Sequence, residues 1–419
     1  MMTSGLPTWV ASNLVPDWGL IPSRPSSEEL APGFFLFAGF SNNYVLDTGD
    51  GLCVIDPGHE RMKDAFYEAV RSWRSSPVHT VAYTHGHVDH VTGFGRFLEE
   101  GERPQIVAQQ NCVQRFQRYQ LTHGFNQHIN RRQTGNPNLQ FPREFLAPTL
   151  TFRDSLTQRI GDLELIYRAV KGETDDYCTI WIPSKRILFV GDMATWKVPN
   201  SGNPLKVQRY PVEWAAALEE MAELGAEWLC PGHDLVLRGA DNIRTFLLDQ
   251  AAYLRSLITQ VLDGMNTGKS YDDILHTTQP DPELANKPHI RAVYNHPQFI
   301  VRDLLRYWGG WWDGEGATLL PVPQADQAQE IVRLAAGTDQ VIDRARGLVA
   351  DGNFALACHL ADWVTNASPE SPSAQQLKRE VYQSRAEHES FGMARGFFLT
   401  EVADAESAMI QTKGAVEGS

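Results

Sequence analysis

The sequence predicts an α/β protein in which helix-covered sheets are followed by a separate all-helical domain. Short apolar, strand-like runs alternate with helical periods over roughly residues 30–265. Between residues 325 and 405 the chain has fewer Trp, Gly and Pro residues and shows helical periods such as QEIVRLAAG, VIDRARGLVADG and ALACHLADWV. The 419 residues also exceed the size of one ordinary hydrophobic core, so two or three domains are expected.

We therefore divide the chain into four segments. Residues 1–29 are expected to be an N-terminal extension, 30–265 the α/β domain, 266–324 a connecting segment rich in Trp, Gly and Pro that packs near the functional site, and 325–419 the helical domain. Scattered Gly, aromatic, Ala and Pro residues in the last segment loosely match the pattern of tetratricopeptide helical pairs, without a sustained repeat. Tetratricopeptide-like packing of helices is therefore expected there.

The elements of the α/β domain can be placed in order along the chain. The first strands are expected in FFLFAGF and NNYVLDTGDGLCVIDPG, where Asp-Gly and Pro-Gly pairs mark turns. A helix over 60–76 and a strand over 78–83 follow, and the strand leads directly into a histidine-rich loop. A polar stretch over 109–140 is long enough to be an insertion that covers a substrate. The later expected elements are strands at 149–152, 163–170, 177–182, 187–190 and 227–230 and a helix over 211–224.

Composition and charge exclude several classes of protein. The 37 Lys and Arg residues stand against 51 Asp and Glu residues, a net charge of −14, which disfavours binding to nucleic acid or to an anionic membrane. The five cysteines are scattered and form no CxxC pair, so neither a disulfide framework nor a thiolate zinc site is expected. Because neither a basic, apolar leader nor a long apolar run is present, we expect a cytoplasmic protein without a membrane span.

The strongest chemical signal is the segment THGHVDH, residues 84–90. It places His85, His87, Asp89 and His90 directly after a predicted strand, and Gly86 permits a tight backbone path between them. Neutral imidazole nitrogens and carboxylate oxygens are ligands for zinc and similar first-row ions. The pairs 85/87 and 89/90 can serve two adjacent ions, so the sequence predicts a metal centre.

With IDPG upstream and PGHD downstream, this motif resembles the metallo-β-lactamase superfamily over about residues 30–250. The resemblance implies an αβ/βα sandwich that holds one or two metals. It also implies the ligand set, which is His85 and His87 for the first ion, Asp89 and His90 for the second, Asp192 as the bridging carboxylate and His233 as the last ligand. Asp89 and Asp192 are the expected catalytic carboxylates. Two divalent ions are expected, with zinc ahead of manganese or iron.

At a seventh position the superfamily usually has a histidine, and this chain has Glu173. We expect Glu173 to be a metal ligand that favours a harder or fully dicationic metal pair. A glutamate here resembles the alkyl sulfatase branch, as do Ala194-Thr195 followed by Asn200 and the WWDG sequence from Trp311. This resemblance implies that the helical domain is a dimerisation domain. Full-length alkyl sulfatases continue into a sterol-carrier-like domain, which we expect to be missing after residue 419.

The residues that differ from the alkyl sulfatase pattern are those expected to contact the substrate. Trp196 and Pro199 stand where the family has histidines, and Phe299 and Ile300 stand where it has His and Asn. The residues expected to bind metal therefore match the family, while those expected to recognise sulfate differ from it. The candidates for contacting a substrate are Lys197, Asn200, Arg209, His123, His128 and Trp311. The basic residues can equally lie on a solvated face, and the tryptophans can equally be packing core.

Taken together, these features predict a dinuclear metal-dependent hydrolase that works as a homodimer. Two dications lower the pKa of a bound water toward neutrality and so provide a hydroxide or water nucleophile. The expected substrate is a small molecule, a sulfate ester or related acidic ester of an apolar alcohol. The alternatives are carboxylester or lactone hydrolysis, or a lyase or decarboxylase step in secondary metabolism, at the same site. A redox role like that of diiron flavoproteins is disfavoured by His87, and a pure binding role by the intact ligand set.

Overall fold

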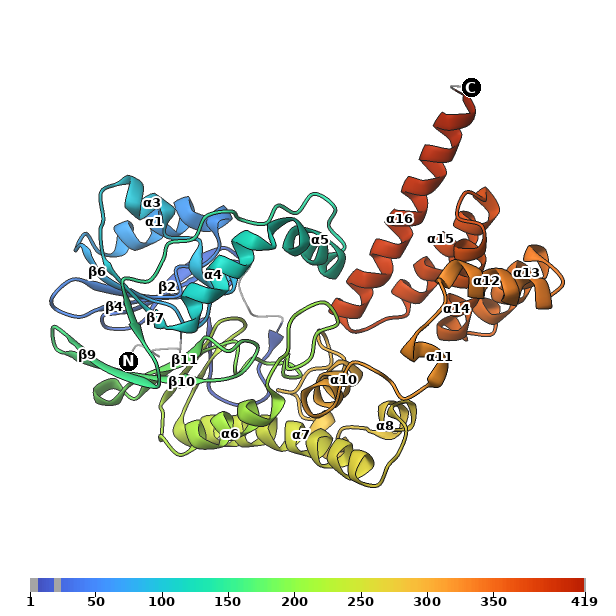
Figure 1. Ribbon diagram of the computed structural model, residues 1–419. Helices are drawn as coiled ribbons and strands as arrows, with labels where there is room; N and C mark the ends of the chain where they lie inside the picture. Colours follow the sequence, from blue (N-terminus) through green and yellow to red (C-terminus); the bar gives the residue numbers. More distant parts are fainter. Residues whose placement is uncertain (1–6, 19–23, 418–419) are drawn as a thin grey trace. The chain divides into compact units, whose positions relative to one another are not determined.

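The computed structural model describes residues 7–18 and 24–417, with side chains up to residue 412, and the chain divides into two compact units (Figure 1). The first unit comprises Met1–His123, Pro142–Arg291 and Pro297–Gly310. The second comprises Gly124–Phe141, Ala292–His296 and Trp311–Ser419. Most of the polar insertion therefore groups with the C-terminal helices.

Within the described residues, the first unit contains two seven-stranded sheets. In spatial order the first sheet consists of β2 (Ser26–Ala31), β3 (Phe34–Ala38), β4 (Asn42–Asp47), β5 (Leu52–Ile55), β6 (Val78–Ala82), β7 (Gln105–Gln109) and β8 (Leu150–Phe152). The second consists of β1 (Val10–Ala11), β14 (Val236–Arg238), β13 (Trp228–Pro231), β12 (Ile187–Gly191), β11 (Tyr177–Ile182), β10 (Leu163–Val170) and β9 (Ser155–Ile160). In the first sheet, β2 to β5 are antiparallel and β5 to β8 parallel.

The two sheets stack face to face around an aromatic core. The ring of Phe34 on β3 lies 5.9 Å from that of Phe189 on β12, and Tyr44 on β4 lies 5.2 Å from Phe189. On the outer face of the first sheet, Phe37 contacts Phe66 of α1 (Lys63–Trp73). Strand β3 is buried along its whole length because both of its faces are covered. This layering confirms the expected αβ/βα sandwich.

The remaining helices of this unit lie in its connections and on the second sheet. Helices α6 (Pro211–Ala222) and α7 (Ala240–Asn266) pack against each other, α6 against β10 and α7 against β13 and β14. The others are α2 (Val88–Val91), α3 (Gly95–Glu99), α4 (Asn111–Leu121), α8 (Tyr271–Thr277), α9 (Pro282–Ala285) and α10 (Pro297–Trp308), with single turns η2 (Glu60–Met62) and η3 (Pro183–Lys185).

The second unit is helical, as expected for the C-terminal part of the chain. It contains α11 (Gly316–Leu319), α12 (Gln324–Leu334), α13 (Thr338–Ala350), α14 (Phe354–Ala367), α15 (Pro372–Glu387) and α16 (Gly392–Glu417), together with most of α5 (His123–Thr134). Neighbouring helices pack pairwise around small and aliphatic side chains, among them Ala345, Ala361 and Leu377. Arg132 of α5 forms ion pairs with Glu401 and Asp404 of α16.

Two expectations from composition can be compared with the structure. The five cysteines are free thiols, and burial raises the pKa of the Cys178 thiol well above its usual value. This favours an inert thiol over a nucleophile. Among residues 7–18 and 24–417, no helix combines the length and apolarity that a membrane crossing requires.

Parallel strand pairs bring the chemically interesting loops together. Ile55 at the end of β5 pairs with Ala82 at the end of β6, and Gly191 at the end of β12 pairs with Pro231 at the end of β13. The loops after β5 and β6 carry Asp56 and the histidine motif, while those after β12 and β13 carry Asp192 and His233. Because parallel strands end at the same edge of a sheet, each sheet contributes two of these loops to the site.

Candidate metal centre

The histidine motif forms a tight loop between β6 and the short helix α2. His85 and His90 are fully buried, and Nε2 of His85 lies 2.9 Å from Nδ1 of His87. Gly86 has no room for a side chain, because a Cβ atom would meet Oδ2 of Asp176 at 2.7 Å and Cδ of Arg115 at 2.8 Å. Close packing therefore requires a glycine here, whereas the sequence analysis expected a tight backbone path.

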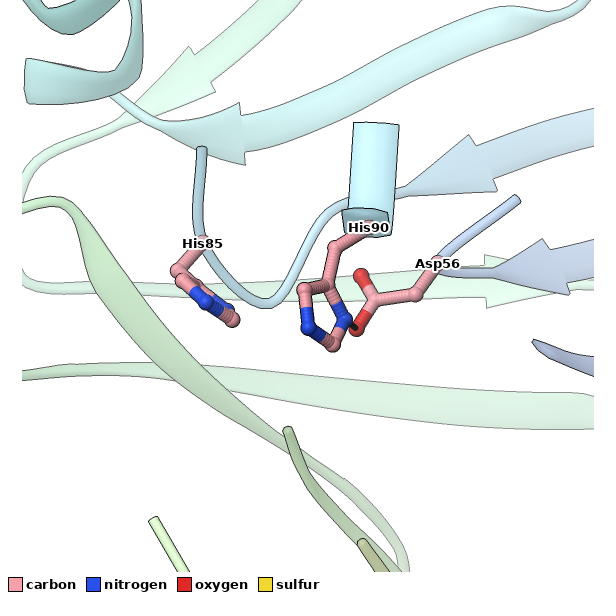
Figure 2. A group of neighbouring side chains, drawn as sticks. All are labelled: Asp56, His85 and His90. Atoms are coloured by element: carbon pink, nitrogen blue, oxygen red, sulfur yellow. Dashed lines mark hydrogen bonds and ion pairs between the residues drawn. The ribbon is translucent and has the colours of Figure 1, made fainter. Parts of the chain in front are cut away.

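Asp56, the residue after β5, fixes the orientation of His90 (Figure 2). Its Oδ1 accepts a hydrogen bond from the Thr84 backbone at 2.7 Å, and its Oδ2 accepts one from Thr84 Oγ1 at 2.6 Å and lies 3.1 Å from Nδ1 of His90. This contact leaves Nε2 of His90 facing away from Asp56, available as a ligand. The sequence analysis did not single out Asp56, although it is the Asp of the IDPG tetrapeptide.

Three groups of possible ligands lie among the described residues. Asp56, His85 and His90 form one group within the first sheet, and the histidine motif forms two clusters with the loops of the second sheet. One consists of His85, His87 and Asp192, the other of Asp89, His90 and His233, and within each cluster the ligand atoms lie within 4.8 Å of one another. The carboxylate of Asp192 reaches both, since Oδ1 lies 3.4 Å from Nε2 of His90 and Oδ2 lies 3.5 Å from Nε2 of His233. The structure therefore brings together the six residues of the expected ligand set.

The buried polar atoms of this arrangement fit a metal site. Across the part of the chain that the structure describes, His90 Nε2 and Asp192 Oδ1 are buried and lack a hydrogen-bond partner. Such atoms are rare in folded proteins and call for a partner. A donor set of four imidazoles and two carboxylates, arranged as two clusters around one shared carboxylate, fits two divalent ions of the zinc type.

The charges at the site explain the shifted pKa values. Burial lowers the pKa of His85 to about 4, and the neighbouring His90 adds to this effect. Burial also acts against a charged His233, but the carboxylates of Asp192 and Asp89 outweigh it and raise the pKa of His233 to about 9. The carboxylates thus favour positive charge on this side of the site, where a bound cation would take the place of the proton.

Glu173 is buried in the loop between β10 and β11 and contacts the first cluster from one side. Its Oε1 accepts a hydrogen bond from Asn200 Nδ2 at 2.7 Å, and its Oε2 lies 3.1 Å from Arg209 Nη1 and 3.4 Å from Nδ1 of His87. Burial raises the pKa of Glu173 to about 7, and Arg209 acts in the opposite direction. Glu173 belongs to neither of the two clusters, and its position beside His87 makes it an additional candidate ligand.

Tyr177, at the start of β11, connects two ligand-bearing loops. Its ring stacks on the imidazole of His85 with centroids 4.5 Å apart. Its hydroxyl oxygen accepts hydrogen bonds from the backbone N–H groups of Asp192 and Met193. Tyr177 therefore positions His85 and Asp192 together, a role that only the folded structure reveals.

The candidate substrate residues have different surroundings. Lys197 Nζ lies 3.1 Å from Asp234, and the side chain of Arg209, which is 2% exposed, binds Glu173 and the Asn200 carbonyl oxygen. His123 begins α5, whereas His128 and Trp311 belong to the second unit. Trp311 is 78% exposed, which is contrary to its interpretation as packing core.

Lys206 is a cation near the site that the sequence analysis missed. Burial and the charge of Arg209 lower its pKa to about 7, while the charges of Glu173 and Asp89 act in the opposite direction. Lys206 lies in an irregular loop without a recognisable motif, so nothing in the sequence pattern indicated it.

Family models match both parts of the chain. The metallo-beta-lactamase superfamily model matches residues 36–233, and the alkyl sulfatase dimerisation model matches residues 270–407. The chain is therefore similar to the alkyl sulfatase-like branch of the metallo-β-lactamase superfamily. This confirms the expected class of metal-dependent hydrolases.

Similar proteins come from the same branch. A linear primary-alkylsulfatase from Pseudomonas sp. (strain ATCC 19151) is 23% identical over 81% of this alkyl sulfatase-like chain and 69% of its own length. An (R)-specific secondary-alkylsulfatase from Pseudomonas sp. is 22% identical over 89% of this chain and 61% of its own length. The solved structure of a stereoselective inverting sec-alkylsulfatase from Pseudomonas sp. shares the fold, with a TM-score of 0.82, 20% identity, and coverage of 93% of this chain and 66% of that one. The chain thus spans about two thirds of the length of these relatives.

Proposed function

We propose that this chain is a dinuclear hydrolase that cleaves the sulfate ester of an apolar alcohol. The observation that carries the proposal is the pair of ligand clusters that share Asp192. The alkylsulfatases among its relatives support the choice of a sulfate ester. Zinc is the proposed metal, because imidazole and carboxylate donors in these numbers suit it.

The residues around the clusters have separate roles in this proposal. Divalent ions, when bound, supply Lewis acidity toward the ester and make water a stronger nucleophile. We assign Asp192 to holding the two clusters together and to accepting a proton, and Asp89, whose carboxylate lies 3.2 Å from Nε2 of His233, to orienting water. Asp56 and Tyr177 keep His90, His85 and Asp192 in position.

The two basic residues nearest the clusters among the expected substrate contacts are engaged by protein groups. Arg209 is committed to Glu173 and to the Asn200 carbonyl oxygen, and Lys197 to Asp234.

The direct test is the release of inorganic sulfate, measured by ion chromatography. Protein of known metal content would be incubated with primary, secondary and aryl sulfates, beside His87→Ala and the matched control His79→Ala, whose residue is exposed on β6. We expect sulfate release in the wild type and the control only, with two metal ions per chain in both. No release from any sulfate, despite two bound ions, would refute the sulfatase proposal.

A second candidate function is a non-sulfate reaction at the same site. Trp196 is 1% exposed and donates its indole N–H to the Leu235 carbonyl oxygen, and Ile300 is fully buried. These side chains belong to the core, where alkyl sulfatases have polar residues. The candidates are carboxylester or lactone hydrolysis and a lyase or decarboxylase step. Product masses obtained in heavy-oxygen water would separate hydrolysis from elimination.

A homodimer is the proposed assembly. The match to the dimerisation model covers residues 270–407, and the second unit exposes Trp311, Leu320 and Leu334 to solvent at 78%, 89% and 80%. Sedimentation of the full chain should give twice the monomer mass, and a monomer at micromolar concentration would refute the proposal.

A further inference from the structure

The hairpin between β3 and β4 carries an exposed aromatic residue next to the candidate metal centre. Phe40 lies at the tip of this hairpin and is 62% exposed. Its ring centroid lies 6.1 Å from that of His233, with the two planes perpendicular, and 5.9 Å from that of His59. Phe40 therefore borders the second ligand cluster while most of its surface faces solvent.

The backbone around Phe40 is fixed to both ligand-bearing loops. Ser41 donates its hydroxyl to the Asp89 carbonyl oxygen at 2.5 Å. Asn42 donates its backbone N–H to the Gly232 carbonyl oxygen at 2.6 Å, beside the ligand His233. On the other side, Arg24 donates to the Phe40 carbonyl oxygen at 3.2 Å. A hairpin tip held in this way presents Phe40 in a defined position relative to the ligands.

The contacts with His233 and His59 leave most of the Phe40 residue exposed, more than packing against these two rings requires. Its backbone bonds are independent of the side chain, and the buried neighbours Phe37 and Tyr44 already supply the core contacts of the two strands. Apolar side chains that are fixed beside a polar reaction centre commonly line ligand sites and orient the apolar part of a ligand.

We propose that Phe40 contacts the apolar alcohol part of the substrate and is a specificity-determining residue. The inference rests on the proposed function, because it assumes a substrate whose ester group is held at the ligand clusters. It goes further in placing the alkyl portion on the side of His233, against the Phe40 ring. We then expect longer alkyl chains to bind more tightly, and this difference to depend on the apolar surface of the Phe40 side chain.

The test uses sulfonates, which keep the anion and the alkyl chain but cannot be hydrolysed at an ester bond. Binding of 1-decanesulfonate and methanesulfonate to the zinc-loaded full chain would be measured by titration calorimetry. The variants are Phe40→Ala and the conservative Phe40→Leu. The matched control is Leu224→Ala, since Leu224 is exposed but precedes β13, at the strand end opposite His233.

For Phe40→Ala we expect decanesulfonate to bind about tenfold more weakly, equivalent to about 1.4 kcal/mol. Methanesulfonate binding should stay unchanged, and both Phe40→Leu and Leu224→Ala should stay near wild type. The inference is overturned if decanesulfonate binding is unchanged in Phe40→Ala, if both sulfonates weaken equally, or if the wild type binds both chain lengths alike. A shift of Phe40→Ala from dimer to monomer in sedimentation would overturn it too, by assigning Phe40 to an interface between copies.

Sulfate release by the same proteins separates this inference from the proposed function. If the wild type binds decanesulfonate through Phe40 but releases no sulfate from decyl sulfate, the sulfatase proposal fails and the contact stands. If the wild type releases sulfate and Phe40→Ala keeps the same dependence on chain length, the contact fails and the sulfatase proposal stands.

Discussion

Arg115→Met should destabilise the protein through a carboxylate that is buried beside the metal loop. Arg115 Nε lies 2.7 Å from Oδ1 of Asp176, and Nη2 lies 2.6 Å from Oδ1 of Asp175. The Asp176 side chain is fully buried, and its Oδ2 also accepts the backbone N–H of Gly86 at 2.8 Å. Removing the guanidinium therefore leaves a buried charge without its partner.

The expected loss can be worked out from the exposure of the two carboxylates. Breaking a buried ion pair by removing one partner costs about 3–5 kcal/mol. The Asp175 side chain is 41% exposed, so its share is that of a surface pair, about 0–1 kcal/mol. We therefore expect a loss of about 3–5 kcal/mol in the free energy of unfolding, most of it from Asp176.

Urea unfolding in the presence of a chelator measures this loss without a contribution from bound metal. Arg168→Met is the matched control, because Arg168 pairs with Glu220 at 2.6 Å while both side chains are more than half exposed. Its loss should stay within about 0.5 kcal/mol. In the double variant Arg115→Met/Asp176→Asn, much of the loss should be recovered, since no buried charge remains. A loss below about 1 kcal/mol for Arg115→Met would refute the reasoning.

Three further outcomes are expected. The variant Tyr177→Phe keeps the ring on His85 but removes the hydroxyl oxygen that accepts the N–H groups of Asp192 and Met193. It should lower the free energy of unfolding in urea by about 1–3 kcal/mol, and an unchanged midpoint would contradict this. Chelation should lower the free energy of unfolding by about 4 kcal/mol for each bound ion, relative to protein with free metal at about 1,000 times its dissociation constant. Calorimetry showing the same melting temperature with and without chelator would argue against a metal site. Burial raises the pKa of Asp303 to about 6, above that of an unfolded carboxyl group. The contribution of Asp303 to stability is therefore present below about pH 4, and it falls by about 3 kcal/mol as the pH rises through 6. The variant Asp303→Asn should remove this pH dependence when unfolding is measured from pH 4 to 7.

The fold class and the ligand motif could be predicted from the sequence, because both depend on residues that are close together along the chain. Strand and helix periods predicted the sandwich, and His85, His87, Asp89 and His90 stand together within one loop. Asp192 and His233 could be placed only through the resemblance to a family. Their position next to the motif depends on the stacking of two sheets, which no local pattern encodes.

The supporting residues could not be predicted, because their roles arise from distant contacts. Asp56 reaches His90 across 34 positions, and Tyr177 reaches the Asp192 backbone across 15. Lys197 looked like an anion contact in the sequence, yet in the fold it pairs with Asp234. The sequence shows that a residue is basic, but it does not show whether its charge faces the site or is already paired with a nearby carboxylate.

The division of the ligand set between the two sheets has a consequence for how the protein is assembled. His85, His87, Asp89 and His90 come from the first sheet, while Asp192 and His233 follow strands of the second. A fragment that contains one sheet holds only part of this ligand set, so capture of the two proposed ions would report that both halves have docked. During synthesis, the histidines of the N-terminal half gain these partners only after residue 233 has been made. Metal binding would then come late in folding and would be sensitive to errors in either half of the sandwich.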